Sequence, residues 1–133
     1  MKVNGFDIDG VIHLGGGKCG IRPGPSDVII TGRSHEEEPE TKAFLEKHGI
    51  KNTVHFNPVP FKAKSRKQAG RHKGRVLLWL KEIKGIEIEF FFEDDEIQKA
   101  EMEELCDWVK IIHVSHNFTE KENVRHLEDL DAK

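Results

Sequence analysis

Short apolar runs that alternate with segments of helical spacing constrain the fold of this 133-residue chain more than any other feature. Five such runs have the length and composition of strands. They cover residues 3–8, 28–30, 54–56, 86–92 and 109–114. Apolar residues recur with helical spacing over residues 34–49, 75–83 and 96–108. Strands that alternate with helices predict an α/β domain built on a largely parallel sheet.

The length and the 36% hydrophobic content suit a single domain with one core, spanning residues 1–133. No repeat or linker divides the chain, and the predicted core covers about residues 1–116. Residues 117–133 form a charged tail, and three of its apolar residues are spaced for one short helix. That helix would either dock on an edge of the sheet or mediate dimerisation. The sequence leaves this choice and the oligomeric state open.

Several features predict a cytoplasmic protein without membrane contact. No apolar run approaches the roughly 20 residues needed to cross a bilayer. Asp7 and Asp9 interrupt the first apolar run, so we expect no signal peptide. Cys19 and Cys106 are too few and too far apart for a disulfide scaffold or a thiolate zinc site, which suits a reducing compartment. The formal net charge of −3 argues against a generic nucleic-acid coat.

Two carboxylates follow the first apolar run, where parallel sheets bind their ligands. In the segment Asp7-Ile8-Asp9-Gly10, an extended backbone sends the side chains of Asp7 and Asp9 to one side. Carboxylates this close repel each other unless a cation or a shared proton relieves them, and Mg²⁺ with oxygen ligands would do so. A polar turn closed by Gly10 explains the same residues equally well.

Hydroxyl and acidic side chains follow the second and fourth runs. Thr31 and Gly32 end the second run, where a hydroxyl beside a helix N-terminus can donate to a phosphate oxygen. An ordinary helix N-cap is the alternative. Residues 93–96 are four consecutive acids at the end of the fourth run. Capping of the next helix explains one of them, Asp95, whereas a metal ion shared with Asp7 would explain the group.

A basic segment, residues 62–75, contains seven Lys or Arg and no acid. Runs of charge are usually solvated, and that interpretation stays open here. The alternative is a patch that faces phosphate groups. Lys73 is then the best placed residue, because it begins the helix predicted to return to the acidic strand.

Taken together, these positions resemble the motifs of the haloacid-dehalogenase-like (HAD) phosphohydrolases. Residues 6–12 are similar to that family's first motif, hhDxDGxx, and residues 29–33 to its second. Lys73 resembles the lysine of the third motif, and residues 91–96 with 112–114 resemble the fourth motif and the last strand of small capless members. The resemblance covers the whole predicted core. Magnesium-dependent phosphatases and polynucleotide-kinase phosphatase domains are the most similar types.

The resemblance implies both a fold and a reaction. The fold is a three-layer, Rossmann-like core with a mainly parallel five-stranded sheet in the order 3-2-1-4-5, helices on both faces and no cap domain. The reaction is Mg²⁺-dependent hydrolysis of a phosphate monoester through an aspartyl-phosphate. Asp7 would be the nucleophile, and Asp9 would protonate the leaving oxygen and then deprotonate the attacking water. Thr31 and Lys73 would hold the phosphoryl oxygens.

The resemblance also implies ligands for the metal ion and the substrate. Mg²⁺ would bind Asp7, Asp94 and the backbone carbonyl of Asp9, with Asp95 acting through water or orienting the shell. Whether Glu93, Asp94 or Asp95 touches the ion is a question of one-residue register. The substrate-binding residues would be Thr31, Gly32, Arg33 and Lys73, with Lys64 and Arg66 for polyanionic substrates.

The intervals in which larger members carry a cap are short here, so we expect an open site. Residues 12–27, rich in glycine and proline, stand where the family usually has a helix. They form either a mobile flap over the site or a shortened connection. The open site and the basic segment favour nucleotides or nucleic-acid ends as substrates. A non-catalytic, phosphate-binding or regulatory HAD-like module is the alternative, against which the retained acid/base residue Asp9 argues.

Overall fold

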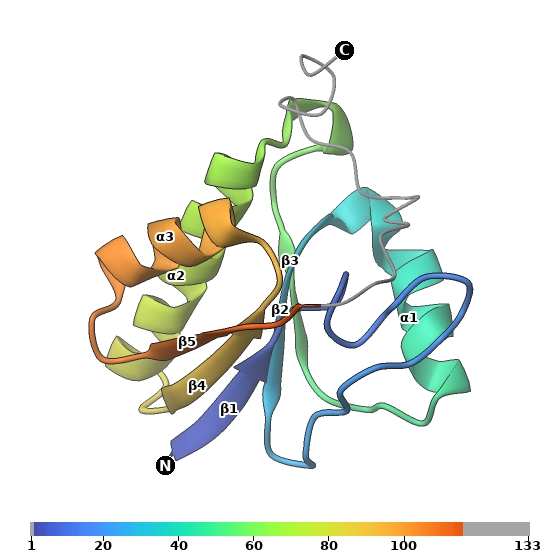
Figure 1. The fold of residues 1–133 in the computed structure, drawn as a ribbon, viewed down its shortest axis with the longest axis horizontal. Helices are drawn as coiled ribbons and strands as arrows, with labels where there is room; N and C mark the ends of the chain where they lie inside the picture. Colours follow the sequence, from blue (N-terminus) through green and yellow to red (C-terminus); the bar gives the residue numbers. More distant parts are fainter. Residues whose placement is uncertain (1, 116–133) are drawn as a thin grey trace.

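The computed structural model describes residues 2–115, which form a five-stranded, all-parallel sheet in the order β3-β2-β1-β4-β5 (Figure 1). Sheet type and strand order are as predicted. The charged tail at 117–133 lies outside the described residues. The strands are β1 (Lys2–Phe6), β2 (Val28–Ser34), β3 (Val54–Asn57), β4 (Glu87–Glu93) and β5 (Lys110–His113).

Helices cover both faces of this sheet and give the three predicted layers (Figure 1). They are α1 (Glu38–Lys47), α2 (Arg66–Glu82) and α3 (Glu96–Leu105), with 3-10 turns η1 (His35–Glu37) and η2 (Phe61–Ala63). Strand alternation divides the core: Val28 and Ile30 pack with α2 and α3, whereas Ile29 packs with Leu45 of α1. No cap domain interrupts residues 2–115, and none of their helices is long and apolar enough to span a membrane.

Helix α2 begins at Arg66, well before residue 75, where apolar spacing predicts its start. Ser65 caps it, accepting a hydrogen bond from the backbone N–H of Gln68 at 2.9 Å. The expectation that Lys73 begins this helix is therefore wrong, because Lys73 lies in its interior. The prediction for α3 is confirmed, since Asp95 caps it by accepting from the N–H of Ile97 at 2.8 Å.

Glycine lets α2 and α3 approach each other closely. A Cβ atom on Gly70 would lie 2.8 Å from the Cα of Gln98, and one on Gly74 would lie 2.7 Å from Leu105. Both distances are shorter than any unstrained contact. The two helices therefore depend on these glycines to pack against one face of β4 and to bring Lys73 to the sheet.

The connection over residues 12–27 forms a small hairpin rather than a helix. Leu14 and Lys18 pair through a backbone hydrogen bond of 2.9 Å, and the glycines between them adopt positive φ. The hairpin packs on α1, where the rings of His13 and Phe44 are 4.4 Å apart. His48 of the same region contacts the carbonyl of Gly17 through its Nε2 at 3.1 Å.

Candidate active site

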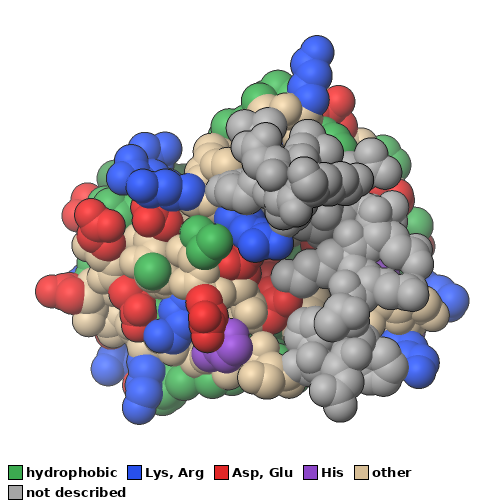
Figure 2. Space-filling view, turned by 45° about the horizontal axis from the view of Figure 1, so that its top comes forward, with side chains coloured by type: hydrophobic (Ala, Val, Ile, Leu, Met, Phe, Trp, Pro, Cys, Tyr) green, Lys and Arg blue, Asp and Glu red, His purple; other side chains and the backbone are tan. Residues whose placement is uncertain are grey.

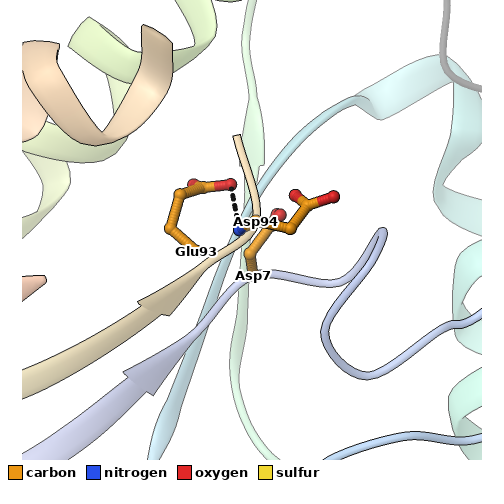
Figure 3. Close-up of side chains that lie close together, drawn as sticks. All are labelled: Asp7, Glu93 and Asp94. Atoms are coloured by element: carbon orange, nitrogen blue, oxygen red, sulfur yellow. Dashed lines mark hydrogen bonds between the residues drawn. The ribbon is translucent and has the colours of Figure 1, made fainter. Parts of the chain in front are cut away.

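The ends of β1 and β4 place acidic side chains next to each other at the carboxyl edge of the sheet (Figure 3). Phe6 pairs with Phe92 in register, and the N–H of Asp7 donates to the carbonyl of Phe92 at 3.1 Å. Asp7, the residue directly after β1, and Glu93, the last residue of β4, therefore lie side by side at the ends of neighbouring strands. Strand β5 fixes the backbone beside them, because Val114 N–H donates to the carbonyl of Glu93 at 2.8 Å.

Lys73 reaches from α2 to both of these carboxylates. Its Nζ lies 3.0 Å from Oδ1 of Asp7 and 2.6 Å from Oε1 of Glu93. All three side chains are buried, and Lys73 is only 1% exposed. Burial alone would lower the pKa of Lys73, but the charges of Asp7 and Glu93 outweigh it and raise that pKa. Lys73 is consequently a fixed cation between two strands.

Asp94 joins these acids to form what we call the acidic cluster: Asp7, Glu93 and Asp94. One carboxylate oxygen from each lies within 4.8 Å of the others. Burial raises the pKa of Asp7 despite the opposing charge of Lys73, and burial raises the pKa of Glu93 well above its usual value. Crowded carboxylates with raised pKa values favour an added cation, and an all-oxygen donor set fits a hard divalent ion such as Mg²⁺.

Asp95 is occupied elsewhere. Besides capping α3, its Oδ2 lies 3.6 Å from Nε of Arg66. Of the three alternatives that the sequence leaves open, the structure thus brings Glu93 and Asp94 to the nucleophile candidate. Strand parity favours Glu93 as a member, because alternation places residues 91 and 93 on the same face, and Phe91 packs in the core beside α2.

Asp9 is held by Arg33 in a two-pronged ion pair. Nε of Arg33 lies 2.8 Å from Oδ2 of Asp9, and Nη2 lies 2.6 Å from Oδ1. The remaining nitrogen, Nη1, donates to Oγ1 of Thr41 at 3.0 Å. Burial would lower the pKa of Arg33, but Asp9 raises it. This arrangement does not support the predicted role of Arg33 as a substrate ligand, because its guanidinium is buried and directed at Asp9.

Thr31 and Gly32 lie within β2, where Thr31 is fully buried and Gly32 faces Lys73. The Oγ1 of Thr31 accepts a hydrogen bond from the N–H of Arg33 at 3.0 Å. A Cβ on Gly32 would lie 3.0 Å from that of Ala69 and 4.0 Å from Cε of Lys73. Glycine at this position therefore allows the close approach of α2.

The basic segment does not form the expected patch. Lys64 is 1% exposed, and its Nζ pairs with Oε1 of Glu37 at 3.0 Å, an arrangement that does not support its predicted contact with substrate. Arg71 pairs with Glu101 on the surface at 2.9 Å. On the face of the molecule that Figure 2 shows, acidic and basic side chains of the described residues lie side by side. Of the predicted polyanion contacts, Arg66 alone keeps a partly exposed side chain.

A cavity of about 340 Å³ adjoins the acidic cluster. It is lined by Arg66, Asp94, Asp95, Glu96 and Ile97. A larger one of about 490 Å³ lies between α1 and β3 and is lined by none of the candidate site residues. Chemistry therefore favours the smaller cavity as the place where a substrate would approach the acids.

Comparison with known proteins supports the fold. No model of a known protein family matches the chain, and no curated protein sequence matches it. A chain in the solved structure of the Pnkp1/Rnl/Hen1 complex is similar in fold, with a TM-score of 0.57 and 18% sequence identity. The similarity covers 85% of the present chain, which spans about 45% of the matched chain. The architecture that carries the acidic cluster thus occurs in a solved structure.

Proposed function

We propose that this chain is a Mg²⁺-dependent phosphomonoesterase of the HAD-like type. The observation that carries the proposal is Lys73, a buried cation held between Asp7 and Glu93 and adjoining Gly32 of β2. A phosphate dianion can approach a carboxylate nucleophile only where cations offset the repulsion between them. The four motifs in order, and the fold shared with a chain of the Pnkp1/Rnl/Hen1 complex, support the same assignment.

In the first step, an oxygen of Asp7 attacks phosphorus, and the bond from phosphorus to the leaving oxygen breaks. Asp9 gives its proton to that oxygen, so the alcohol leaves neutral. Lys73 and the hydroxyl of Thr31 hold the phosphoryl oxygens as charge redistributes. In its hydrogen bond with the N–H of Arg33, the hydroxyl of Thr31 is the acceptor, so its own O–H can donate to a phosphoryl oxygen.

In the second step, the carboxylate of Asp9 takes a proton from water, and the hydroxide attacks the phosphorus of the aspartyl-phosphate. The bond from phosphorus to Asp7 breaks, which releases phosphate and restores both aspartates. Asp7, Asp94 and the carbonyl of Asp9 would hold Mg²⁺, which supplies charge neutralisation at the phosphoryl group. Asp95 would support this set by capping α3 directly after Asp94.

A nucleotide or a nucleic-acid end is the substrate class that we propose. No cap covers the site within residues 2–115, so an extended substrate can reach it. Arg66 lines the cavity beside the acids, and Lys62 and Lys67 are exposed near it in sequence. These accessible bases of the basic segment would contact a polyanion, whereas Lys64 and Lys73 are buried.

The test is a phosphatase assay on small esters, mononucleotides and phosphorylated oligonucleotides, with Mg²⁺ or with EDTA. We expect hydrolysis in Mg²⁺, its loss in EDTA, and a decrease of at least about 1,000-fold in Asp7→Asn. Asp107→Asn is the matched control, because Asp107 is exposed and outside the site. Equal turnover by Asp7→Asn would contradict the mechanism, and phosphate binding without turnover would indicate the regulatory module instead.

A further inference from the structure

Each of the three guanidinium nitrogens of Arg33 donates a hydrogen bond within the candidate site. Its guanidinium meets both oxygens of Asp9, at 2.8 and 2.6 Å, and its third nitrogen donates to Thr41. Its side chain is 4% exposed. These hydrogen bonds use three of the five N–H groups of the guanidinium, and the side chain is almost completely buried.

The backbone of Arg33 is engaged in the same site. Its N–H donates to Oγ1 of Thr31 at 3.0 Å, so one residue contacts both the acid/base candidate and the phosphate-binding hydroxyl. Asp9 lies in the loop after β1 and Thr31 lies in β2, and Arg33 connects them. The orientation of the Thr31 hydroxyl and that of the Asp9 carboxylate therefore depend on one side chain and its own peptide group.

Behind Arg33, a chain of buried contacts fixes the guanidinium. Oγ1 of Thr41 accepts from Nη1 and donates to the carbonyl of Glu37 at 2.7 Å. The carboxylate of Glu37 is in turn paired with Lys64. The start of α1 and the loop before α2 thus form a support against which Arg33 rests. A planar guanidinium that is hydrogen-bonded to Asp9 on one side and to Thr41 on the other has little freedom to rotate away from Asp9.

We propose that Arg33 is a positioning residue, which holds Asp9 in line with the leaving oxygen and Thr31 toward the phosphoryl group, and that it does not bind substrate. This inference rests on the proposed phosphatase function. It replaces the motif-based expectation of a substrate contact, and the two differ in measurable ways. A substrate ligand affects KM, whereas a residue that aims the proton donor affects kcat.

The leaving group supplies a second distinction. Proton donation matters most when the leaving oxygen is basic, as in an alkyl phosphate, and least when it is a stabilised phenolate, as in 4-nitrophenyl phosphate. A misplaced Asp9 should therefore slow the first step, which kcat/KM reports, selectively for alkyl esters. The second step, in which Asp9 takes a proton from water, is common to both esters and does not enter kcat/KM. Loss of general structural integrity would lower kcat/KM equally for both substrates.

The experiment compares kcat and KM for glycerol 2-phosphate and 4-nitrophenyl phosphate in wild type, Arg33→Met, Arg33→Lys, Asp9→Asn and the double variant Asp9→Asn/Arg33→Met. We expect Arg33→Met to lower kcat/KM about 100-fold for the alkyl ester and less than about 10-fold for the aryl ester, whereas loss of a substrate ligand would lower it equally for both. Arg33→Lys should recover part of the loss. In the Asp9→Asn background, removal of Arg33 should cost little more.

Arg71→Met is the matched control, because Arg71 also pairs with a carboxylate but on the surface, and it should behave as wild type. If Arg33→Met does not fold, Thr41→Val makes the same test, since it removes one support of the guanidinium. A rise in KM at constant kcat, or equal losses of kcat/KM for both esters, would overturn the positioning role alone. Absence of hydrolysis by wild type would overturn the proposed function and the positioning role with it.

Discussion

Replacement of Lys73 by methionine removes the cation that Asp7 and Glu93 share while keeping the volume of the side chain. At 3.0 and 2.6 Å, each pair has a Coulomb energy of about 6 kcal/mol at an effective dielectric constant of about 20. Desolvation of three buried groups opposes most of that energy. Breaking a buried ion pair on one side costs about 3–5 kcal/mol, and we expect Lys73→Met to lose that much free energy of unfolding.

Lys64→Met is the matched control for this variant. Both lysines are 1% exposed and both pair with a buried glutamate, but Lys64 has one carboxylate partner, Glu37, and lies outside the acidic cluster. Both variants should be destabilised. Only Lys73→Met leaves the carboxylates of the acidic cluster without their resident cation, so only that variant should gain affinity for Mg²⁺.

The assay is urea denaturation of wild type and both variants at pH 7, with EDTA and with about 10 mM Mg²⁺. An ion at ten times its Kd stabilises the folded state by about 1.4 kcal/mol, and each further tenfold gain in affinity adds about as much again. We expect the Mg²⁺-dependent stabilisation to be larger in Lys73→Met than in wild type, and unchanged in Lys64→Met. A loss below about 1 kcal/mol for Lys73→Met, or the same Mg²⁺ response in both variants, would refute the reasoning.

Three further predictions concern the same region. Burial lowers the pKa of His72 to about 4, so between pH 4 and about pH 6.5 the unfolded chain binds more protons than the folded one. The free energy of unfolding therefore decreases as the pH is lowered through this window. From pH 7 to pH 5, wild type should lose about 2 kcal/mol more than His72→Gln in urea denaturation; parallel curves would contradict this. Gly70→Ala should cost about 1–3 kcal/mol, because its Cβ would meet the backbone of Gln98, and an unchanged thermal midpoint would argue against the close packing. Asp94→Asn should abolish stabilisation by Mg²⁺ whereas Asp95→Asn should retain it, and the reverse result would move the metal ligand by one residue.

The strands could be predicted because their signal is local. Each apolar run has few residues, and alternation along Val28, Ile29 and Ile30 already divides two faces, as the two core clusters confirm. The order of strands in the sheet is not a local property, and it followed only from the motif resemblance. The early start of α2 had a local signal that apolar spacing overlooks: Ser65 followed three residues later by Gln68 is a capping-box pattern.

The partners of the charged residues could not be predicted, because they are chosen across the fold. Arg33 pairs with an acid 24 residues away in the chain, and Lys64 with one 27 residues away. Nothing in the local sequence separates Lys64, which is buried, from Lys62, which is exposed. Burial of a lysine is favourable only where a carboxylate is already in place, so the role of each base depends on strand register and on helix packing.

These pairings change how the near-neutral charge of the chain bears on function. Around the candidate site, five carboxylates face three cations, so the formal charge of the group is −2. The acids are Asp7, Asp9, Glu37, Glu93 and Asp94, and the cations are Arg33, Lys64 and Lys73. A divalent cation would balance the group, and a phosphate dianion could then enter without facing excess negative charge. Arg33 and Lys64, which the resemblance assigns to substrate, thus serve first as counterions of these acids. Under the proposed function, the metal ion and Lys73 would then attract the phosphate.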